Sequence, residues 1–230
     1  MKILYEDNHL LVVVKPVNIP VNSDQSNDND LLSQLKDYLK EKYQKPGNVY
    51  LGLVHRLDRP VGGIMVFAKT SKAASRLSDA LRRKEFHKSY LAVCCGKAQQ
   101  QARLTDYLSK DEKTNTSRVT DKDHGKLAIL DYQLLEYHEG LSLVQVDLQT
   151  GRSHQIRVQM SHHDLPLWGD QRYNPLAKAG QQIALFACRL SFPHPVSKEI
   201  LTFQTLPDKR KPWNEFAIER LMETHEKEEN

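Results

Sequence analysis

The sequence predicts a single α+β domain. Short apolar runs of strand length are interspersed with segments whose apolar residues recur at helical spacing, and neither an internal repeat nor a break in composition marks a domain boundary. The 230 residues are enough to bury a substantial core. The formal net charge of +4, from 33 Lys and Arg against 29 Asp and Glu, suits an anionic partner without requiring one.

The first fifty residues predict a strand, a loop and a helix. Residues 10–14 are apolar and β-branched, as expected of a buried strand, and residues 16–29 are rich in Pro, Asn, Asp and Ser. Apolar residues then recur at helical spacing over 31–39, and Asp28 or Asp30 could cap that helix.

The next segment predicts two strands around a loop, followed by a basic helix. Strands are expected over 49–54 and 64–68, with a loop over 55–63 between them. Thr70 or Ser71 can cap a helix that reaches Lys84. The exposed positions of that helix are strongly basic, and include Lys72, Arg76, Arg82, Arg83 and Lys84.

The second half predicts further strands around one helix. Residues 97–126 are polar, and we expect a mobile insertion there. A helix is expected to follow Thr150-Gly151, because Ile156 and Met160 take up helical spacing. The other expected elements are strands over 90–93, 144–148 and 183–192, and an acidic helix with a frayed tail over 213–230.

Cysteine content and hydropathy favour the cytoplasm. Neighbouring residues of a strand point to opposite faces, so a disulfide between Cys94 and Cys95 is not expected, and three cysteines are an odd number. The apolar run 10–14 is too short for a signal peptide, and we find no segment long enough to span a membrane.

One acidic residue stands out in the loop over 55–63. Asp58 lies between Arg56 and Arg59, and two glycines end the loop. Two interpretations are open. Asp58 could fix a turn in a salt-bridged loop, or it could be a carboxylate that the guanidinium groups keep ionised and ready to act as a nucleophile.

Two other segments could contribute to a site, and each has a structural alternative. The segment from Thr150 to Arg157 begins a helix, where backbone N–H groups and arginines favour an anion, although an exposed basic helix start has the same appearance. Tyr90 enters a strand after the basic helix, where a core tyrosine is also common.

Together these segments resemble the RluA-type RNA pseudouridine synthases. The resemblance rests on His55-Arg56-Leu57-Asp58 with Phe67-Ala68-Lys69-Thr70, on Lys88-x-Tyr90, and on Thr150-Gly151-Arg152-x-His154-Gln155-Ile156-Arg157. It extends from about Ile3 to Leu206. Lesser matches are Tyr5-Glu6-Asp7, Lys15-Pro16, Gly169-Asp170 with Tyr173, and Phe192-Pro193-His194-Pro195. Val61-Gly62-Gly63 lacks the Ser or Thr usual before the glycine, and Gln159 replaces a frequent His.

The resemblance implies a fold, an activity and a site. It implies one catalytic domain over 1–212 with a central mixed, mainly antiparallel sheet, without the small N-terminal RNA-binding domain of some relatives. Asp58 would be the catalytic carboxylate, Tyr90 the ring against the target base, and Arg157 the ion-pair partner of Asp58. The residues expected to contact RNA are Arg56, His55, Arg152, His154 and Gln155. The implied partner is structured RNA, either ribosomal or transfer RNA. We expect neither a cofactor nor a metal, and we expect the enzyme to be a monomer.

Two rival functions remain at this point. A metal-dependent hydrolase could use His162-His163-Asp164, although adjacent histidines on a helix do not readily share one metal ion. A protein of the same fold could instead bind or remodel RNA without catalysis, and it would have the same salt-sensitive affinity for RNA.

Overall fold

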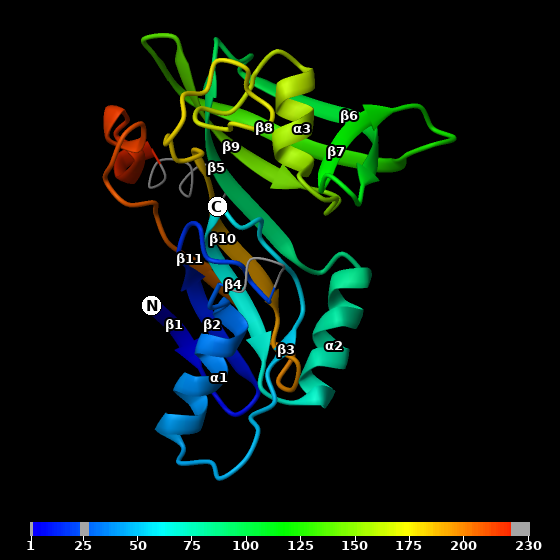
Figure 1. Cartoon of the computed structure of the whole chain (residues 1–230), viewed down its shortest axis with the longest axis vertical. Helices are drawn as coiled ribbons and strands as arrows, with labels where there is room; N and C mark the ends of the chain where they lie inside the picture. The colour runs from blue at the N-terminus through cyan, green and yellow to red at the C-terminus, as the bar shows by residue number, and fades with distance from the viewer. Residues whose placement is uncertain (1, 24–27, 222–230) are drawn as a thin grey trace. The chain divides into compact units, whose positions relative to one another are not determined.

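The computed structural model describes residues 2–23 and 28–221, and Figure 1 shows the course of the chain. The chain divides into two compact units. The first unit comprises Met1–Lys88 and Ala187–Thr205, and the second comprises Ser89–Phe186 and Leu206–Asn230. Strands and helices occur in both, which confirms the predicted α+β class. The expected domain limits, 1–212 and 213–230, stay a prediction.

The first unit is built on antiparallel strand pairs. β2 lies between β1 and β4, β3 also pairs with β4, and β10 pairs with β11. These strands are β1 Lys2–Glu6, β2 Leu10–Lys15, β3 Gly52–Leu53, β4 Gly62–Ala68, β10 Leu185–Pro193 and β11 Ile200–Gln204. Every residue of β4 is buried, so the loop that precedes it is attached to a fixed strand.

Two capped helices belong to the first unit. Helix α1, Leu31–Lys42, begins after Asp30, whose carboxylate accepts a hydrogen bond from the backbone N–H of Ser33 at 3.0 Å. Helix α2, Ser71–Arg82, begins after Thr70, whose hydroxyl accepts one from Ala73 at 3.1 Å. The main core packs α2 against the strands, and its members include Leu10, Val12, Ile64, Val66, Leu77, Phe86 and Phe192.

The described part of the second unit carries strands in the order β5-β9-β8-β6-β7, paired antiparallel. These are β5 His87–Cys95, β6 Gln101–Asp111, β7 Thr116–Thr120, β8 Lys126–His138 and β9 Leu141–Leu148. Helix α3, Gln155–His162, packs on β6 and β7, and Val158 meets Leu108 of β6 and Ala128 of β8. No helix among the described residues is both long and apolar enough to cross a membrane.

The prediction of a mobile insertion over residues 97–126 was wrong. Residues 101–120 form the β6–β7 hairpin instead. Only one face of this hairpin is covered, so Leu104 and Leu108 are buried while most other side chains are polar and at least partly exposed. A strand of this kind has too few apolar residues to be recognised from composition.

Other expectations differ in extent. Strands β1, β8 and β11 were not predicted, and the strand expected over 49–54 is reduced to β3. The C-terminal helix begins as a short 3₁₀ turn, Trp213–Glu215, and its expected tail over 222–230 lies outside the described residues. Cys94 and Cys95 do not form a disulfide with each other, as expected of neighbours in one strand.

Gly63, at the start of β4, allows two backbone segments to approach closely. Its φ angle is +127°, and a Cβ atom added there would lie 2.4 Å from the carbonyl oxygen and 2.5 Å from the nitrogen of Ala187. Both the backbone conformation and the lack of space therefore require glycine. The close approach fixes the strand directly after the Asp58 loop.

We predict that Gly63→Ala lowers the free energy of unfolding by about 3 kcal/mol or more, because strain and overlap with backbone add. Gly140→Ala is the matched control, since Gly140 has a φ of +80° but nothing within 4 Å of an added Cβ, and it should cost about 1 kcal/mol. Chemical denaturation measures both values. Equal losses in the two variants would contradict the close approach.

Candidate active site

The Asp58 loop links β3 to β4 in the first unit. Asp58 is half-buried, whereas Arg56 and Arg59 are exposed. The guanidinium group of Arg59 pairs with Asp28, and its Nε donates to the carbonyl oxygen of Asn18 at 3.2 Å. The loop thus presents a carboxylate between two exposed arginines, one of which ties it to the segment before α1.

Lys15 holds the backbone of this loop, although the sequence indicated Lys15 only as part of a lesser motif. It has no exposed surface, and its Nζ donates to the carbonyl oxygens of Pro16 at 2.9 Å, Arg59 at 2.9 Å and Val61 at 2.8 Å. The N–H of Val61 in turn donates to the carbonyl oxygen of Asp58 at 3.0 Å. One buried amino group therefore holds the backbone on the C-terminal side of Asp58.

The environment of Lys15 opposes its charge. Burial lowers the pKa of Lys15, the charge of Asp58 raises it and the charge of Arg59 lowers it, and the net result is a pKa of about 7. Lys15 is therefore sensitive to the charge of the carboxylate that its hydrogen bonds help to place.

His55, expected to contact RNA, has structural contacts. Its Nε2 accepts a hydrogen bond from the backbone N–H of Val66 at 3.2 Å, and its ring lies edge-on to Phe86 at 6.3 Å. Burial, followed by the charge of Lys88, lowers the pKa of His55 to about 3. The imidazole is therefore neutral near pH 7, and an RNA contact by His55 stays a prediction.

Tyr90 lies in β5 of the second unit, opposite Val146 of β9, and is 7% exposed. The preceding Ser89 is also buried and donates a hydrogen bond to Asp147 of β9. Tyr90 thus lies within a paired strand, so its position is set by the sheet and not by a loop. Its contact with a base stays a prediction.

Arg157 projects from α3 and is held by Asp170. Its Nε and Nη2 donate to the two carboxylate oxygens of Asp170 at 2.8 Å and 2.7 Å. The Cζ atom of Arg157 also lies 5.1 Å from the ring centre of Tyr173. Sequence reasoning named Asp170 and Tyr173 only within a lesser motif, and gave neither residue a role.

The turn before α3 is braced by Gln155. Its Oε1 accepts hydrogen bonds from the hydroxyl of Thr150 at 2.8 Å and from the N–H of Arg152 at 2.9 Å, and its Nε2 donates to the carbonyl oxygen of Ile129 at 3.0 Å. Arg152 is exposed, and its Nε donates to the carbonyl oxygen of Leu127 at 2.9 Å. RNA contacts by Arg152 and Gln155 stay predictions.

His154 precedes α3 in the left-handed conformation, with φ of 53°, and makes no side-chain cap. It is buried, and its Nδ1 lies 2.7 Å from the hydroxyl of Tyr173. Gln159, the departure from the family pattern, is also buried and donates to Asp106 at 2.7 Å. An RNA contact by His154 stays a prediction.

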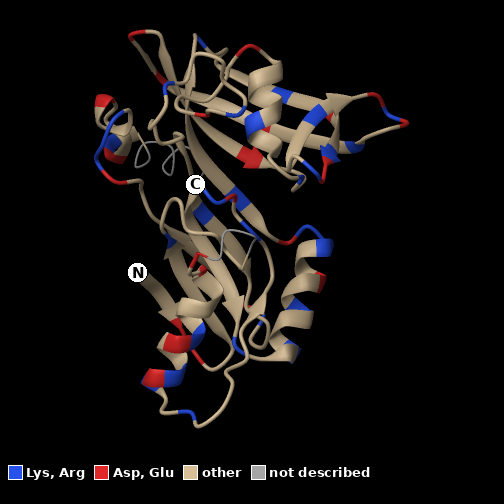
Figure 2. Ribbon diagram, in the orientation of Figure 1, with Lys and Arg blue, Asp and Glu red and all other residues tan. Residues whose placement is uncertain are grey.

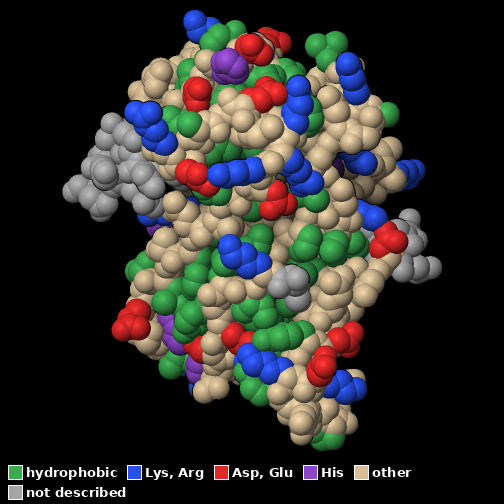
Figure 3. Space-filling model, turned by 90° about the vertical axis from the view of Figure 1, so that its left-hand side faces the viewer, with side chains coloured by type: hydrophobic (Ala, Val, Ile, Leu, Met, Phe, Trp, Pro, Cys, Tyr) green, Lys and Arg blue, Asp and Glu red, His purple; other side chains and the backbone are tan. Residues whose placement is uncertain are grey.

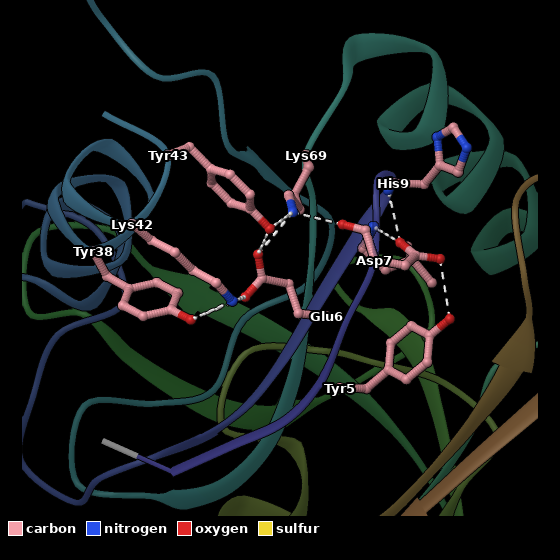
Figure 4. Close-up of polar contacts among 9 residues, drawn as sticks. Tyr5, Glu6, Asp7, His9, Tyr38, Lys42, Tyr43 and Lys69 are labelled. Carbon is pink, nitrogen blue, oxygen red and sulfur yellow. Dashed lines mark hydrogen bonds and ion pairs between the residues drawn. The ribbon is translucent and has the colours of Figure 1, made fainter. Parts of the chain in front are cut away.

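The opening motif of the chain forms a polar cluster in the first unit (Figure 4). Glu6 accepts hydrogen bonds from four side chains, those of Tyr38, Lys42, Tyr43 and Lys69. Burial raises the pKa of Glu6, but these bonds outweigh it and lower the pKa to about 2. Asp7 accepts from the backbone of His9 and Leu10, and His194 lies 2.9 Å away. Asp7 thus stabilises the β1–β2 turn, and Glu6 joins the end of β1 to α1 and to Lys69.

The metal-dependent rival gains no support from the residues that the structure describes. His162 and His163 are exposed, and their rings meet edge to face with centres 5.3 Å apart. His163 lies 3.1 Å from Asp106. Within the described ranges, no group of three His, Cys, Asp or Glu side chains is arranged to hold a metal ion.

The predicted catalytic residues are each fixed inside one unit. Asp58 belongs to the first unit, and Tyr90 and Arg157 belong to the second. The expected ion pair between Asp58 and Arg157 stays a prediction, as do the catalytic roles.

Comparison with known proteins points to one family. A family model described as RNA pseudouridylate synthase matches residues 9–162. Ribosomal large subunit pseudouridine synthase D of Yersinia pestis is 37% identical over 174 residues, which cover 75% of this chain and 52% of that protein. The protein of the same name from Neisseria meningitidis serogroup A is 34% identical over 222 residues, which cover 90% and 59%. The chain thus spans between half and three-fifths of the length of these two relatives.

The fold is also similar to a solved structure. Human RNA Pseudouridylate Synthase Domain Containing 4 matches with a TM-score of 0.77 over 96% of this chain and 93% of that chain, at 21% sequence identity. At this identity the similarity concerns the fold alone.

We predict that Lys15→Met speeds hydrogen exchange of the Val61 amide by roughly tenfold or more, because hydrogen bonds from a charged donor contribute about 1.5–3 kcal/mol. Exchange measured by NMR or mass spectrometry should show the change over residues 58–63. The control is Lys97→Met, which removes an exposed lysine over the ring of Tyr137. Unchanged exchange in the loop would mean that Lys15 does not hold it.

We predict that His55 stays neutral down to about pH 4. Its folded pKa of about 3 lies below the ordinary histidine pKa of 6.5, so only the unfolded chain binds this proton between those values. Stability should therefore fall as pH drops through this window, by at most about 1.4 kcal/mol per pH unit. His55→Gln should flatten that slope. NMR titration of the ring measures the pKa directly, and a value above 5 would contradict the burial.

Proposed function

Because this chain belongs to the family of RNA pseudouridylate synthases, we propose that it isomerises uridine in RNA to pseudouridine. The observation that carries the proposal is the extent of the family match. It covers residues 9–162 and so includes Asp58, Tyr90 and Arg157 in their expected order. The RluA-type resemblance of the motifs is confirmed by this match.

The isomerisation exchanges one bond to the sugar for another. The glycosidic bond between N1 and C1′ breaks, the uracil turns, and a bond forms between C5 and C1′. The proton on C5 leaves and N1 carries a proton in the product, so atoms and electrons balance without an oxidant or reductant. We therefore expect no cofactor and no metal.

Asp58 is the residue best suited to start this exchange. A carboxylate can attack C1′ and form a covalent intermediate, or it can remove a sugar proton and so promote departure of the base. Both routes need the carboxylate at a fixed position against the ribose, and the backbone contacts of Lys15 support such a position. Tyr90 would pack against the uracil, and Arg157 would pair with Asp58.

A base can react only after it leaves its stack, so the enzyme must bind the displaced strand. The exposed Arg56 is two residues from Asp58 and suits this task. Lys and Arg also recur along α2 (Figure 2), although Asp79 and Glu85 pair with Arg82 and Arg83. Because these acids offset part of the charge of α2, we expect a few local contacts and a moderate salt dependence. Basic and acidic side chains are also interspersed on the face in Figure 3.

Ribosomal RNA is our preferred substrate over transfer RNA. Two relatives are named as large-subunit ribosomal enzymes, and this chain shares 37% and 34% of aligned residues with them. We also propose that the protein is a monomer. We propose that it acts in the cytoplasm, where the thiols of its three cysteines stay reduced.

The decisive experiment substitutes Asp58. In cells that lack the gene, wild-type protein should restore pseudouridine at specific uridines, and chemical mapping of ribosomal and transfer RNA would identify them. Asp58→Asn should lower the rate on that RNA by at least about 10³-fold, because it removes the reacting carboxylate and keeps its shape. RNA affinity should change less than about threefold.

Asp131→Asn is the matched control, because Asp131 also binds an arginine, Arg103, at 2.6 Å, but on the open face of β8. It should retain activity. If wild-type protein binds RNA yet forms no pseudouridine in any RNA, the proposal fails and an RNA-binding protein of the same fold takes its place.

A further inference from the structure

Arg157 is oriented by a buried carboxylate. The side chains of Arg157 and Asp170 are 6% and 1% exposed, and two parallel hydrogen bonds of 2.8 Å and 2.7 Å join them. A bond at two points fixes both the plane and the direction of a guanidinium group, because the donor fork matches the two carboxylate oxygens. Since Asp170 takes Nε and Nη2, it also sets the direction of Nη1.

Asp170 is itself held in place. Its Oδ1 also accepts a hydrogen bond from the N–H of Arg172 at 3.1 Å, and its carbonyl oxygen accepts one from the N–H of Asn174 at 2.8 Å. The side chain of Asn174 donates to the carbonyl oxygen of Leu167 at 3.0 Å. These hydrogen bonds restrain rotation of the Asp170 carboxylate, so the turn over 170–174 holds it in one orientation toward Arg157.

Tyr173 restrains Arg157 through its ring. The hydroxyl of Tyr173 accepts a hydrogen bond from the N–H of Ser117 in β7 at 2.8 Å and lies 2.7 Å from Nδ1 of His154. The ring is thereby anchored at both ends, by its backbone and by its hydroxyl, while its face lies against the guanidinium group. Arg157 is thus restrained by a carboxylate and by an aromatic face.

We propose that Asp170 and Tyr173 are positioning residues that aim Arg157 for the isomerisation, an inference that rests on the proposed function. Stability alone is a poor reason for this arrangement. A buried ion pair gains little over apolar residues of similar volume, because both charges lose their hydration. What the pair does provide is a single orientation of a charged group, which a reaction at a fixed carboxylate requires.

The first test is Asp170→Asn, which keeps the shape and removes the charge. On the RNA that wild-type protein modifies, kcat should fall at least tenfold, while KM and RNA affinity change less than twofold. Asp131→Asn, which breaks the ion pair between Asp131 of β8 and Arg103, should leave kcat within twofold of wild type. Activity is measured below the unfolding temperature of every variant, with the folded fraction checked by circular dichroism.

A second test separates positioning from folding. In an Arg157→Met background, Asp170→Asn should change kcat less than twofold, because the group that it positions is gone. Tyr173→Leu should lower kcat about tenfold, whereas Tyr173→Phe, which keeps the ring, should stay within threefold of wild type.

The inference is overturned if Asp170→Asn retains kcat, if it has the same effect with and without Arg157, or if the loss follows the unfolded fraction. If the Arg157→Met variant does not fold, the comparison of Tyr173→Leu with Tyr173→Phe tests the inference instead. Equal activity of Tyr173→Leu and wild type would show that Tyr173 does not position Arg157. An inactive wild-type protein contradicts the proposed function instead, and is recognised before any variant is compared.

Discussion

A buried amino group determines where the proposed catalytic carboxylate, Asp58, can lie. Asp58 sits in a loop without regular structure, and such loops move unless their backbone is held. Lys15 holds it through the carbonyl oxygens of Arg59 and Val61, and Gly63 then brings the chain into the fully buried β4. The position of Asp58 therefore depends on a cation that the fold encloses completely.

The same principle recurs in the second unit with the charges exchanged. There the cation is the functional candidate, and the carboxylate of Asp170 is its support. In both places a more deeply buried charged group supports a residue of the proposed site, through the backbone beside Asp58 and through the side chain at Arg157. Such supports are costly to bury, and they are useful because they allow only one arrangement.

The sequence predicted what depends on local pattern. The apolar periodicity of α2 and the β-branched run of β2 were sufficient, and the order of motifs identified Asp58, Tyr90 and Arg157 as candidates. The supports Lys15 and Asp170 appeared only within lesser motifs, and their contacts could not be found in this way. Lys15 reaches Arg59 and Val61 across more than forty positions, with separations of 44 and 46, and Asp170 lies 13 positions beyond Arg157, so only the folded chain shows these contacts. The polar β6–β7 hairpin was missed because one of its faces is open.

The choice between lysine and arginine at the two buried cations follows from their tasks. Burial lowers the pKa of Lys15 to about 7, so near neutral pH its charge is only partly retained. Its task tolerates this in part, because a neutral amine still donates two of the three hydrogen bonds to carbonyl oxygens. Position 157 is proposed to face a carboxylate, where the charge itself is needed. A guanidinium group stays protonated when buried, and its planar fork allows Asp170 to set its direction, so a lysine at this position would lose both properties.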